Sequence, residues 1–332
     1  MKNCKKSIFA LAVVVFLLLG LFNGIVTAAD IQFPSKPITA VIPFGAGGGT
    51  DRSVRMLSMV WEKWANVQMN VVNMPGAGSA EGMRYVVESD PDGYTIVQNG
   101  SQMLTLPYFY SKEEIGWTLD DFEPIAIQQI IPYLLVVPKT SPFKTLKEFI
   151  EYGRANPGKI MHGVVGYGGD SHVAFKALEL VADFVATVVP FDSGADQVAN
   201  IAGSHIDAAV ATAGTMLPLI QSGDARVLAV GTEKRIPMLP DVPTAIEQGI
   251  DWTCPNWRGW LAPPGTPREL IDYIAGIIEK ALKDDNELSD KIISAGEEPM
   301  YMGPEEFAEY LIRVDKIMGP AIKAIQAEEN RK

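Results

Sequence analysis

The stretch IPFGAGGGTDRSVRML, residues 42–57, decides the fold. It follows the apolar run ITAV and places four glycines within the five positions 45–49. After them, apolar residues recur at Val54, Leu57 and Trp61, which is the spacing of an amphipathic helix. Thr50 or Asp51 is suited to cap the start of that helix. The stretch therefore predicts a short buried strand, a glycine loop and the N-terminus of a helix.

The same order recurs along the chain. MNVVN (69–73) precedes the glycine loop MPGAGSAEG, TIVQNG (95–100) ends in a polar loop, and IMHGVVGYGGDSH (160–172) runs into a third glycine loop. Strands that alternate with helices predict mixed, mostly parallel sheets flanked by helices, and so an α/β protein. The pattern restarts near residue 131, so we expect two α/β units of similar plan. Ligands of such sheets lie beyond the carboxyl ends of the strands, which makes Ser101 a candidate contact.

The first 28 residues have the composition of a targeting segment. MKNCKK supplies three lysines, a long apolar run follows, and TAAD supplies small residues. This order predicts a secretory signal peptide cleaved near Ala28, with a retained membrane anchor as the alternative. Cleavage also removes Cys4, so Cys254 would be left without a partner for an internal disulfide. We expect Cys254 to be a buried small apolar residue.

Charge and motifs argue against several function classes. The formal net charge of −12 disfavours nucleic acid and anionic membranes as partners. Thr50 and Glu81 stand where a dinucleotide-binding G-x-G-x-x-G would have its third glycine, and neither loop has the lysine of a P-loop. The chain lacks a G-x-S-x-G elbow, and its three histidines, His162, His172 and His205, lack metal-ligand spacing. We therefore expect no catalytic residue, metal or cofactor, and an exported α/β enzyme remains the weaker alternative.

Glycine loops at helix N-termini are suited to bind an anion. The first turn of a helix presents N–H groups without intrahelical partners, and the helix dipole is positive there. Glycines let a carboxylate reach these groups without obstruction by a Cβ. The three loops would converge if their strands run in the same direction. The alternative is that the glycines serve only tight turns and helix–strand packing.

Seven separated motifs resemble those of one protein family. They are VIPFGAGGGTDRSVRMLS (41–58), VVNMPGAGSAEGMRYV (71–86), DPDGYTIV (90–97), FEPIA (122–126), FKTLKEFIEYGRANPGKI (143–160), LPDVPTAIEQG (239–249) and WRGWLAPPGTP (257–267). In this order they resemble the substrate-binding proteins of tripartite tricarboxylate transporters, the TctC or Bug family. The resemblance covers about residues 30–330. It implies a class II, Venus-flytrap periplasmic binding protein with a small carboxylated ligand and a two-component membrane permease as partners. Its lobes would be residues 29–130 plus 256–332 and residues 131–255.

The resemblance also implies where the ligand lies. The family's first ligand loop corresponds to residues 44–51, its second to 76–79 and its far-lobe loop to 167–172, and the segment VVPFDSGADQV brings residue 192 near the cleft. With the loop after residue 100, the candidate ligand contacts are Phe44, Ala46, Gly47, Gly48, Gly49, Thr50, Gly78, Ser79, Ser101, Tyr167, Gly169, Asp170, Ser171, His172 and Asp192.

Individual roles follow from chemistry. Gly47, Gly48 and Gly49 are the expected backbone donors to a carboxylate, and Thr50 suits a ligand contact better than Asp51, whose charge would repel it. Ser171 is expected to donate a hydroxyl hydrogen bond from the far lobe. His172 either donates to the ligand or caps its own helix. Phe44 and Tyr167 either wall the cleft or pack into the core.

Three residues depart from the family pattern. Ser79 stands where an asparagine is common, Asp170 where a neutral residue is usual, and Asp192 where a lysine is frequent. Two additional acids near the cleft would repel a second carboxylate and would suit a zwitterion such as an amino acid. The alternative is that both acids face solvent or cap helices.

The sequence thus predicts a periplasmic, monomeric solute-binding protein that closes two lobes around a carboxylate or zwitterionic ligand. A periplasmic sensor that presents the same clamp to a receptor kinase is the other alternative.

Overall fold

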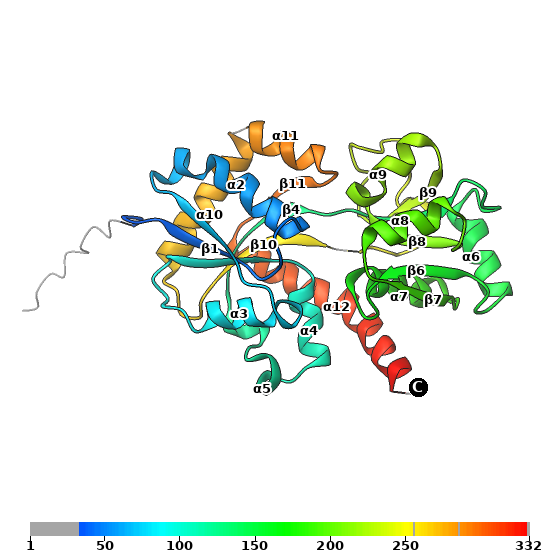
Figure 1. Ribbon diagram of the computed structural model, residues 1–332, viewed down its shortest axis with the longest axis horizontal. Coiled ribbons are helices and arrows are strands. Elements are labelled where there is room, and N and C mark those ends of the chain that lie inside the picture. Colours follow the sequence, from blue (N-terminus) through cyan, green and yellow to red (C-terminus); the bar gives the residue numbers. More distant parts are fainter. Residues whose placement is uncertain (1–32, 255, 285, 331–332) are drawn as a thin grey trace, which may run out of the picture. The chain divides into compact units, whose positions relative to one another are not determined.

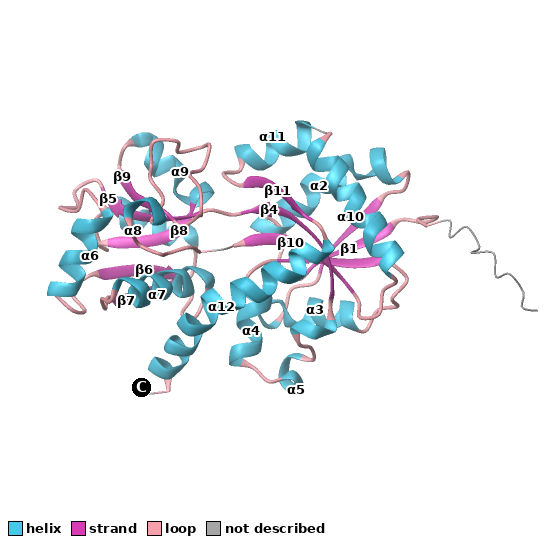
Figure 2. Cartoon of the chain, turned by 180° about the vertical axis from the view of Figure 1, so that it is seen from behind, coloured by secondary structure: helices cyan, strands magenta, loops and turns pink. Residues whose placement is uncertain are grey.

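Two mixed sheets flanked by helices make up the chain from Lys36 onward (Figures 1 and 2). The computed structural model describes residues 33–254, 256–284 and 286–330. The predicted signal peptide, residues 1–28, lies outside the described residues. The predicted α/β class with two units of similar plan is confirmed.

The first sheet has six strands in the order β11-β4-β10-β3-β1-β2. Strand β1 pairs in parallel with β2 and β3, and β10, β4 and β11, each antiparallel to its neighbours, extend the sheet beyond β3. Their bounds are β1 Ile38–Ile42, β2 Met69–Asn73, β3 Thr95–Asn99, β4 Glu123–Ile130, β10 Trp257–Ala262 and β11 Glu298–Met302.

The second sheet repeats this plan with five strands in the order β7-β6-β8-β5-β9. Here β6 pairs in parallel with β7 and β8, and the antiparallel strands β5 and β9 follow. Their bounds are β5 Tyr133–Pro138, β6 Met161–Val165, β7 Thr187–Phe191, β8 Ala208–Thr212 and β9 Ala225–Val230. The lobe boundaries near residues 130 and 255 stay a prediction.

Helices cover both faces of each sheet (Figure 1). On the first sheet α2, α10 and α11 lie on one face, and α3, α4 and α12 lie on the other. Their bounds are α2 Gly49–Ala65, α3 Ala80–Val87, α4 Gln102–Phe109, α5 Lys112–Ile115, α10 Arg268–Lys283, α11 Asn286–Ser294 and α12 Pro304–Glu329. Around the second sheet lie α6 Leu146–Ala155, α7 Asp170–Ala182, α8 Gly194–Ala202 and α9 Ala213–Ser222, and three short 3₁₀ turns lie at Ala77–Ser79, Leu119–Asp121 and Ile246–Gln248.

The antiparallel strands β4, β10 and β11 are elements that the sequence pattern missed. β4 carries two wholly buried glutamines, Gln128 and Gln129, which interrupt its apolar pattern. Inside the sheet these amides bond one another and Ser53, and the Trp260 indole donates to Gln128 Oε1 over 2.8 Å. Buried amides that are satisfied in this way cost little, but their partners come from distant parts of the chain.

Helix α12 joins the two sheets. Its first half packs on β4, and it also lies against α7 of the second sheet (Figure 1). Near its C-terminus the Glu328 carboxylate pairs over 2.9 Å with the buried Lys176 ammonium, which also pairs with Glu179. The helix is continuous from Pro304 to Glu329 although Pro320 lies inside it.

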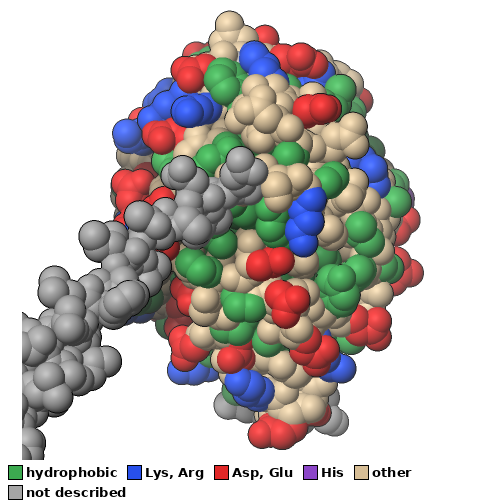
Figure 3. Space-filling view, turned by 90° about the vertical axis from the view of Figure 1, so that its left-hand side faces the viewer, with side chains coloured by type: hydrophobic (Ala, Val, Ile, Leu, Met, Phe, Trp, Pro, Cys, Tyr) green, Lys and Arg blue, Asp and Glu red, His purple; other side chains and the backbone are tan. Residues whose placement is uncertain are grey.

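The surface matches the acidic composition. On the face shown in Figure 3, lysines and arginines lie singly or in small groups among acidic and apolar side chains. Within the described residues no helix is both long and apolar enough to span a bilayer.

Replacement of Gly259 by alanine should destabilise the protein. A Cβ at this β10 position would lie 2.4 Å from the buried Phe307 ring, so the strand or α12 must shift. We expect a loss of about 1–3 kcal/mol in the free energy of unfolding, measured by urea titration. Gly276→Ala is the matched control, because nothing lies within 4 Å of its Cβ position on α10. It should stabilise the helix by about 0.5–1 kcal/mol. Equal stability of Gly259→Ala and the wild type would contradict this packing.

Candidate functional site

The first glycine loop ends in a helix N-terminus that its own side chains hold in place. Gly48 is the N-cap of α2 with an extended backbone, so the helix begins two residues before the predicted caps. The Gly47 N–H donates to Asp51 Oδ2 over 2.9 Å, and Asp51 also binds the Arg55 guanidinium at 3.0 Å. Asp51 is thus not the N-cap residue that we expected. It is the third residue of α2, and its side chain accepts a hydrogen bond from the loop that precedes the helix. In this structure the Gly47 N–H is already engaged.

The third glycine loop repeats this geometry. Gly169 is the extended N-cap of α7, and the Gly168 N–H donates over 3.0 Å to Nδ1 of His172 at the third helical position. His172 therefore corresponds to Asp51, and Asp170 corresponds to Gly49. We expected His172 either to donate to the ligand or to cap its own helix. The structure shows a local contact of the second kind, with the loop before α7.

The three parallel strands of the first sheet bring their loops to one edge. Residues 44–49 follow β1, residues 74–79 follow β2 and residues 100–101 follow β3. The Asn73 amide at the end of β2 donates to the Phe44 carbonyl and to Asp51 Oδ1, at 3.1 and 2.9 Å, and so joins β2 to the first loop. Strands β1 and β2 therefore share the direction on which convergence of the first two glycine loops depends, whereas the third glycine loop follows β6 of the second sheet, and its convergence with them stays a prediction.

The second glycine loop contains a strained, buried serine. Ser79 has φ of 100°, a region that side chains rarely adopt, and it follows Gly78 at φ 66°. Ser79 is 1% exposed, and its hydroxyl has no hydrogen-bond partner among the described residues. Such strain and an unsatisfied polar group are typical of ligand sites, which supports Ser79 as a contact.

Ser101 joins the first sheet's loops to the third glycine loop. Its hydroxyl lies 2.8 Å from Asp170 Oδ2 and 3.2 Å from Asn256 Oδ1, and it donates its single hydrogen to one of them. Asn256 in turn donates to the Tyr133 hydroxyl over 3.3 Å. Burial raises the pKa of the Asp170 carboxyl, and the Ser101 contact and the nearby Arg258 charge oppose that rise.

Arg258 is a candidate site residue that our sequence reasoning missed. Its guanidinium Nη2 lies 2.8 Å from the Cβ position of Gly49, and its Nη1 lies 2.9 Å from that of Gly100. It reaches this edge because β10 runs antiparallel to β3, so β10 starts where β3 ends. The one sequence signal that includes it is the WRGWLAPPGTP motif, which does not show that its arginine reaches the glycine loops.

The other predicted residues have these local surroundings. Ser171 accepts a hydrogen bond from the Val165 N–H at 2.9 Å, which leaves its hydroxyl hydrogen able to donate, so the expected donation to the ligand stays a prediction. The Tyr167 ring lies against His172, with 4.7 Å between ring centroids. Asp192 is exposed, at the turn before α8. Thr50 is buried, whereas Ala46 and Gly48 are exposed.

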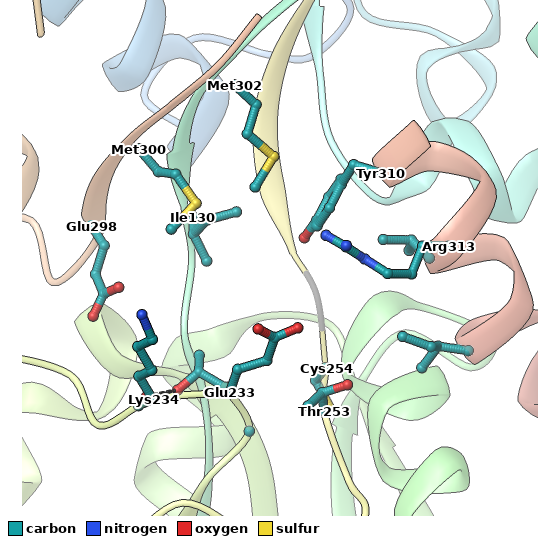
Figure 4. A pocket seen from close by; sticks show the side chains of 14 residues that line it. Ile130, Glu233, Lys234, Thr253, Cys254, Glu298, Met300, Met302, Tyr310 and Arg313 are labelled. Carbon is teal, nitrogen blue, oxygen red and sulfur yellow. Dashed lines mark hydrogen bonds between the residues drawn. The ribbon is translucent and has the colours of Figure 1, made fainter. Parts of the chain in front are cut away.

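A separate pocket of about 220 Å³ lies on the other face of β10 (Figure 4). Trp257 turns toward this side and meets Tyr310 of α12, with 5.5 Å between ring centroids, whereas the next residue, Arg258, lies against the glycine loops. The walls are Ile130, Met300, Met302 and Tyr310, with Glu233, Lys234, Glu298 and Arg313 around them. None of the predicted ligand contacts lines this pocket.

Other chemistry-bearing groups serve packing. His162 stacks on Phe175 with 3.4 Å between ring centroids, and burial lowers its pKa. Cys254 is buried, which raises the pKa of its thiol. Among the described residues, no group of three His, Cys, Asp or Glu side chains could hold a metal ion.

Comparison with known proteins decides the family. The model of the tripartite tricarboxylate transporter family receptor, TctC, matches residues 59–326. The chain belongs to this family. TctC proteins are periplasmic solute-binding receptors, not enzymes, that bind small carboxylates and serve a tripartite transporter. The predicted family and receptor function are confirmed, and the comparisons give no support to the sensor or enzyme alternatives.

Individual relatives agree with this assignment. A UPF0065 protein of Cupriavidus necator is 30% identical over 280 residues, with 84% of each chain covered. A TctC solute-binding protein from Polaromonas has a TM-score of 0.75 at 27% identity, over 91% of this chain and 100% of that one. Rpa4515 of R. palustris, solved with adipate, has a TM-score of 0.71 at 25% identity, over 87% of this chain and 99% of that one. The TctC receptor therefore shares its two-lobed fold with these structures.

The bond network of Asp51 should make stability depend on pH. The hydrogen bond from Arg55, with those from Gly47 and Asn73, lowers the Asp51 pKa to about 2. A lowered folded-state pKa adds stability that is present above the unfolded-state pKa and is lost as pH falls through the folded-state value. Asp51→Asn should therefore lose about 1–2 kcal/mol at pH 7, since Arg55 is half exposed and screened, and this difference should shrink between pH 4 and pH 2.

Urea titrations at pH 7, 4 and 2.5 would measure this effect, with the exposed Asp290→Asn of α11 as the control. A difference between Asp51→Asn and the wild type that stays constant down to pH 2.5 would contradict the assigned bonds.

Proposed function

We propose that this TctC receptor holds a carboxylate of its ligand at the N-terminus of α2, between the glycine loops of two lobes. The observation that carries this proposal is the convergence of three loops at one edge of the first sheet, with the Ser101–Asp170 contact joining them to the α7 loop. The amides of Gly48 and Gly49, with the positive end of the α2 dipole, would be the donors.

Binding would close the clamp. A ligand that contacts the loops after β1, β2 and β3 and also the α7 loop favours the conformation in which both sets approach. The segments around residues 130 and 255, where the chain passes from one sheet to the other, would act as the hinge, with lobes of 29–130 plus 256–332 and 131–255. The closed, monomeric receptor would then deliver its ligand to a two-component membrane permease.

The remaining predictions agree with this function. Export to the periplasm would use the signal peptide, with cleavage near Ala28. The ligand class includes molecules such as adipate, with which the related Rpa4515 was solved. Mass spectrometry of small molecules retained by the natively purified protein would identify the ligand directly.

The Gly48→Leu variant tests the α2 cradle. The Gly48 backbone has φ of −72°, and its Cβ position meets only the Gly45 carbonyl at 3.5 Å, so leucine fits without strain. We expect an intact fold with a carboxylate-induced rise in melting temperature reduced to near zero, since a ligand stabilises only the state that it binds.

The panel for this measurement is adipate, succinate, citrate and aspartate, with melting followed by circular dichroism. Gly276→Leu on α10 is the matched control and should keep the full rise. A rise in Gly48→Leu equal to that of the wild type would exclude the α2 N-terminus as the carboxylate site.

A further inference from the structure

Arg258 is a half-buried cation that forms no ion pair with the described residues. Its Nε is buried and has no hydrogen-bond partner among the described residues, and its Nη1 donates only to the neighbouring Trp257 carbonyl at 3.1 Å. No carboxylate of the described chain lies within the 4 Å of an ion pair with it. A partly buried charge without a direct ion-pair partner is costly, so an anion in contact with this guanidinium would stabilise it.

The groups around Arg258 also favour the binding of an anion. Its guanidinium lies against Gly49, the first residue of α2, where the helix dipole is positive. Arg52 adds a second positive charge nearby. The charges that oppose it are Glu297, held by the Gln129 amide, and Asp170. Two cations and a helix N-terminus at one point form a site for a carboxylate.

Asp170, in contrast, has a carboxylate oxygen that could accept a hydrogen bond from a donor group. Its Oδ2 is engaged by Ser101, but its Oδ1 is buried and has no hydrogen-bond partner among the described residues. Asp170 is close enough to feel the Arg258 charge and yet forms no ion pair with it. If the two groups served only to neutralise each other, they would be in contact. The guanidinium and the carboxylate are therefore more than 4 Å apart, so each can bond to another group.

We propose that Arg258 binds the carboxylate of the ligand while Asp170 Oδ1 accepts a hydrogen bond from an ammonium group of the same molecule. The cleft would then select amino-bearing carboxylates over the corresponding simple acids. This inference rests on the proposed function and specifies its ligand class. It retains Asp170 from the sequence hypothesis and drops Asp192, which is exposed.

Two ligand pairs, adipate with 2-aminoadipate and succinate with aspartate, test the proposal by titration calorimetry. The members of each pair differ by one ammonium group. We expect the wild type to bind the amino-bearing member of at least one pair about ten- to hundredfold more tightly, which is the range for a hydrogen bond to a charged group. Asp170→Asn should remove that preference, whereas Asp192→Asn, its exposed control, should keep it.

Arg258→Gln should weaken binding of both members of the pair by about tenfold or more, with Arg258→Lys intermediate because it keeps the charge without the planar fork. Arg313→Gln, on the other face of β10, is the control and should bind as the wild type does. Thermal melts followed by circular dichroism verify that the ligand-free variants fold. If Arg258→Gln does not fold, the loss of affinity is measured on Arg258→Lys instead.

Each other outcome overturns a distinct claim. The proposed hydrogen bond between Asp170 and the ammonium group is wrong if carboxylates bind without a preference for the amino-bearing member. It is also wrong if the Asp170→Asn variant retains that preference. Unchanged affinity in Arg258→Gln would mean that the guanidinium does not hold the carboxylate. Absence of binding by all four compounds and by citrate would overturn the proposed function as well.

Discussion

The hydrogen bond from a loop N–H to the third residue of the following helix is the interaction on which the site depends. It occurs twice, from Gly47 to Asp51 and from Gly168 to His172. In each case it fixes the turn between a central strand and its helix, so that the first-turn amides of α2 and α7 keep a defined direction. Without it the glycines would make both loops too free in conformation to present donors at fixed positions.

The same edge of the first sheet holds three polar groups without hydrogen-bond partners among the described residues. They are the Ser79 hydroxyl, Arg258 Nε and Asp170 Oδ1, whereas the buried amides of Gln128 and Gln129 are paired. Buried polar groups are ordinarily paired, so these three unsatisfied groups support the ligand site that we propose at the converging loops. The pocket near Tyr310 lacks the glycine loops and lies on the opposite face of β10.

Much of the fold follows from local pattern. The strands at 38–42, 69–73 and 95–99 and the glycine loops after them are visible because apolar runs and glycines are local signals. β4 and β10 were missed because their polar residues are satisfied only by partners far along the chain. The site shows the same division. The loops were predictable, whereas Arg258 was not, because it reaches Gly49 from more than 200 positions away in the sequence.

The sequence by itself determined the family, the two α/β units and the glycine loops at helix N-termini, since these depend on residues adjacent in the chain. Only the tertiary structure decided the surroundings of the two additional acids. Asp170 is half-buried and lies against Ser101 because α7 begins there, and Asp192 is exposed because it lies in the turn before α8. Whether a charged side chain serves a ligand depends on what surrounds it, and for Asp170 and Arg258 those surroundings come from β3, α2 and α7, which only folding brings together.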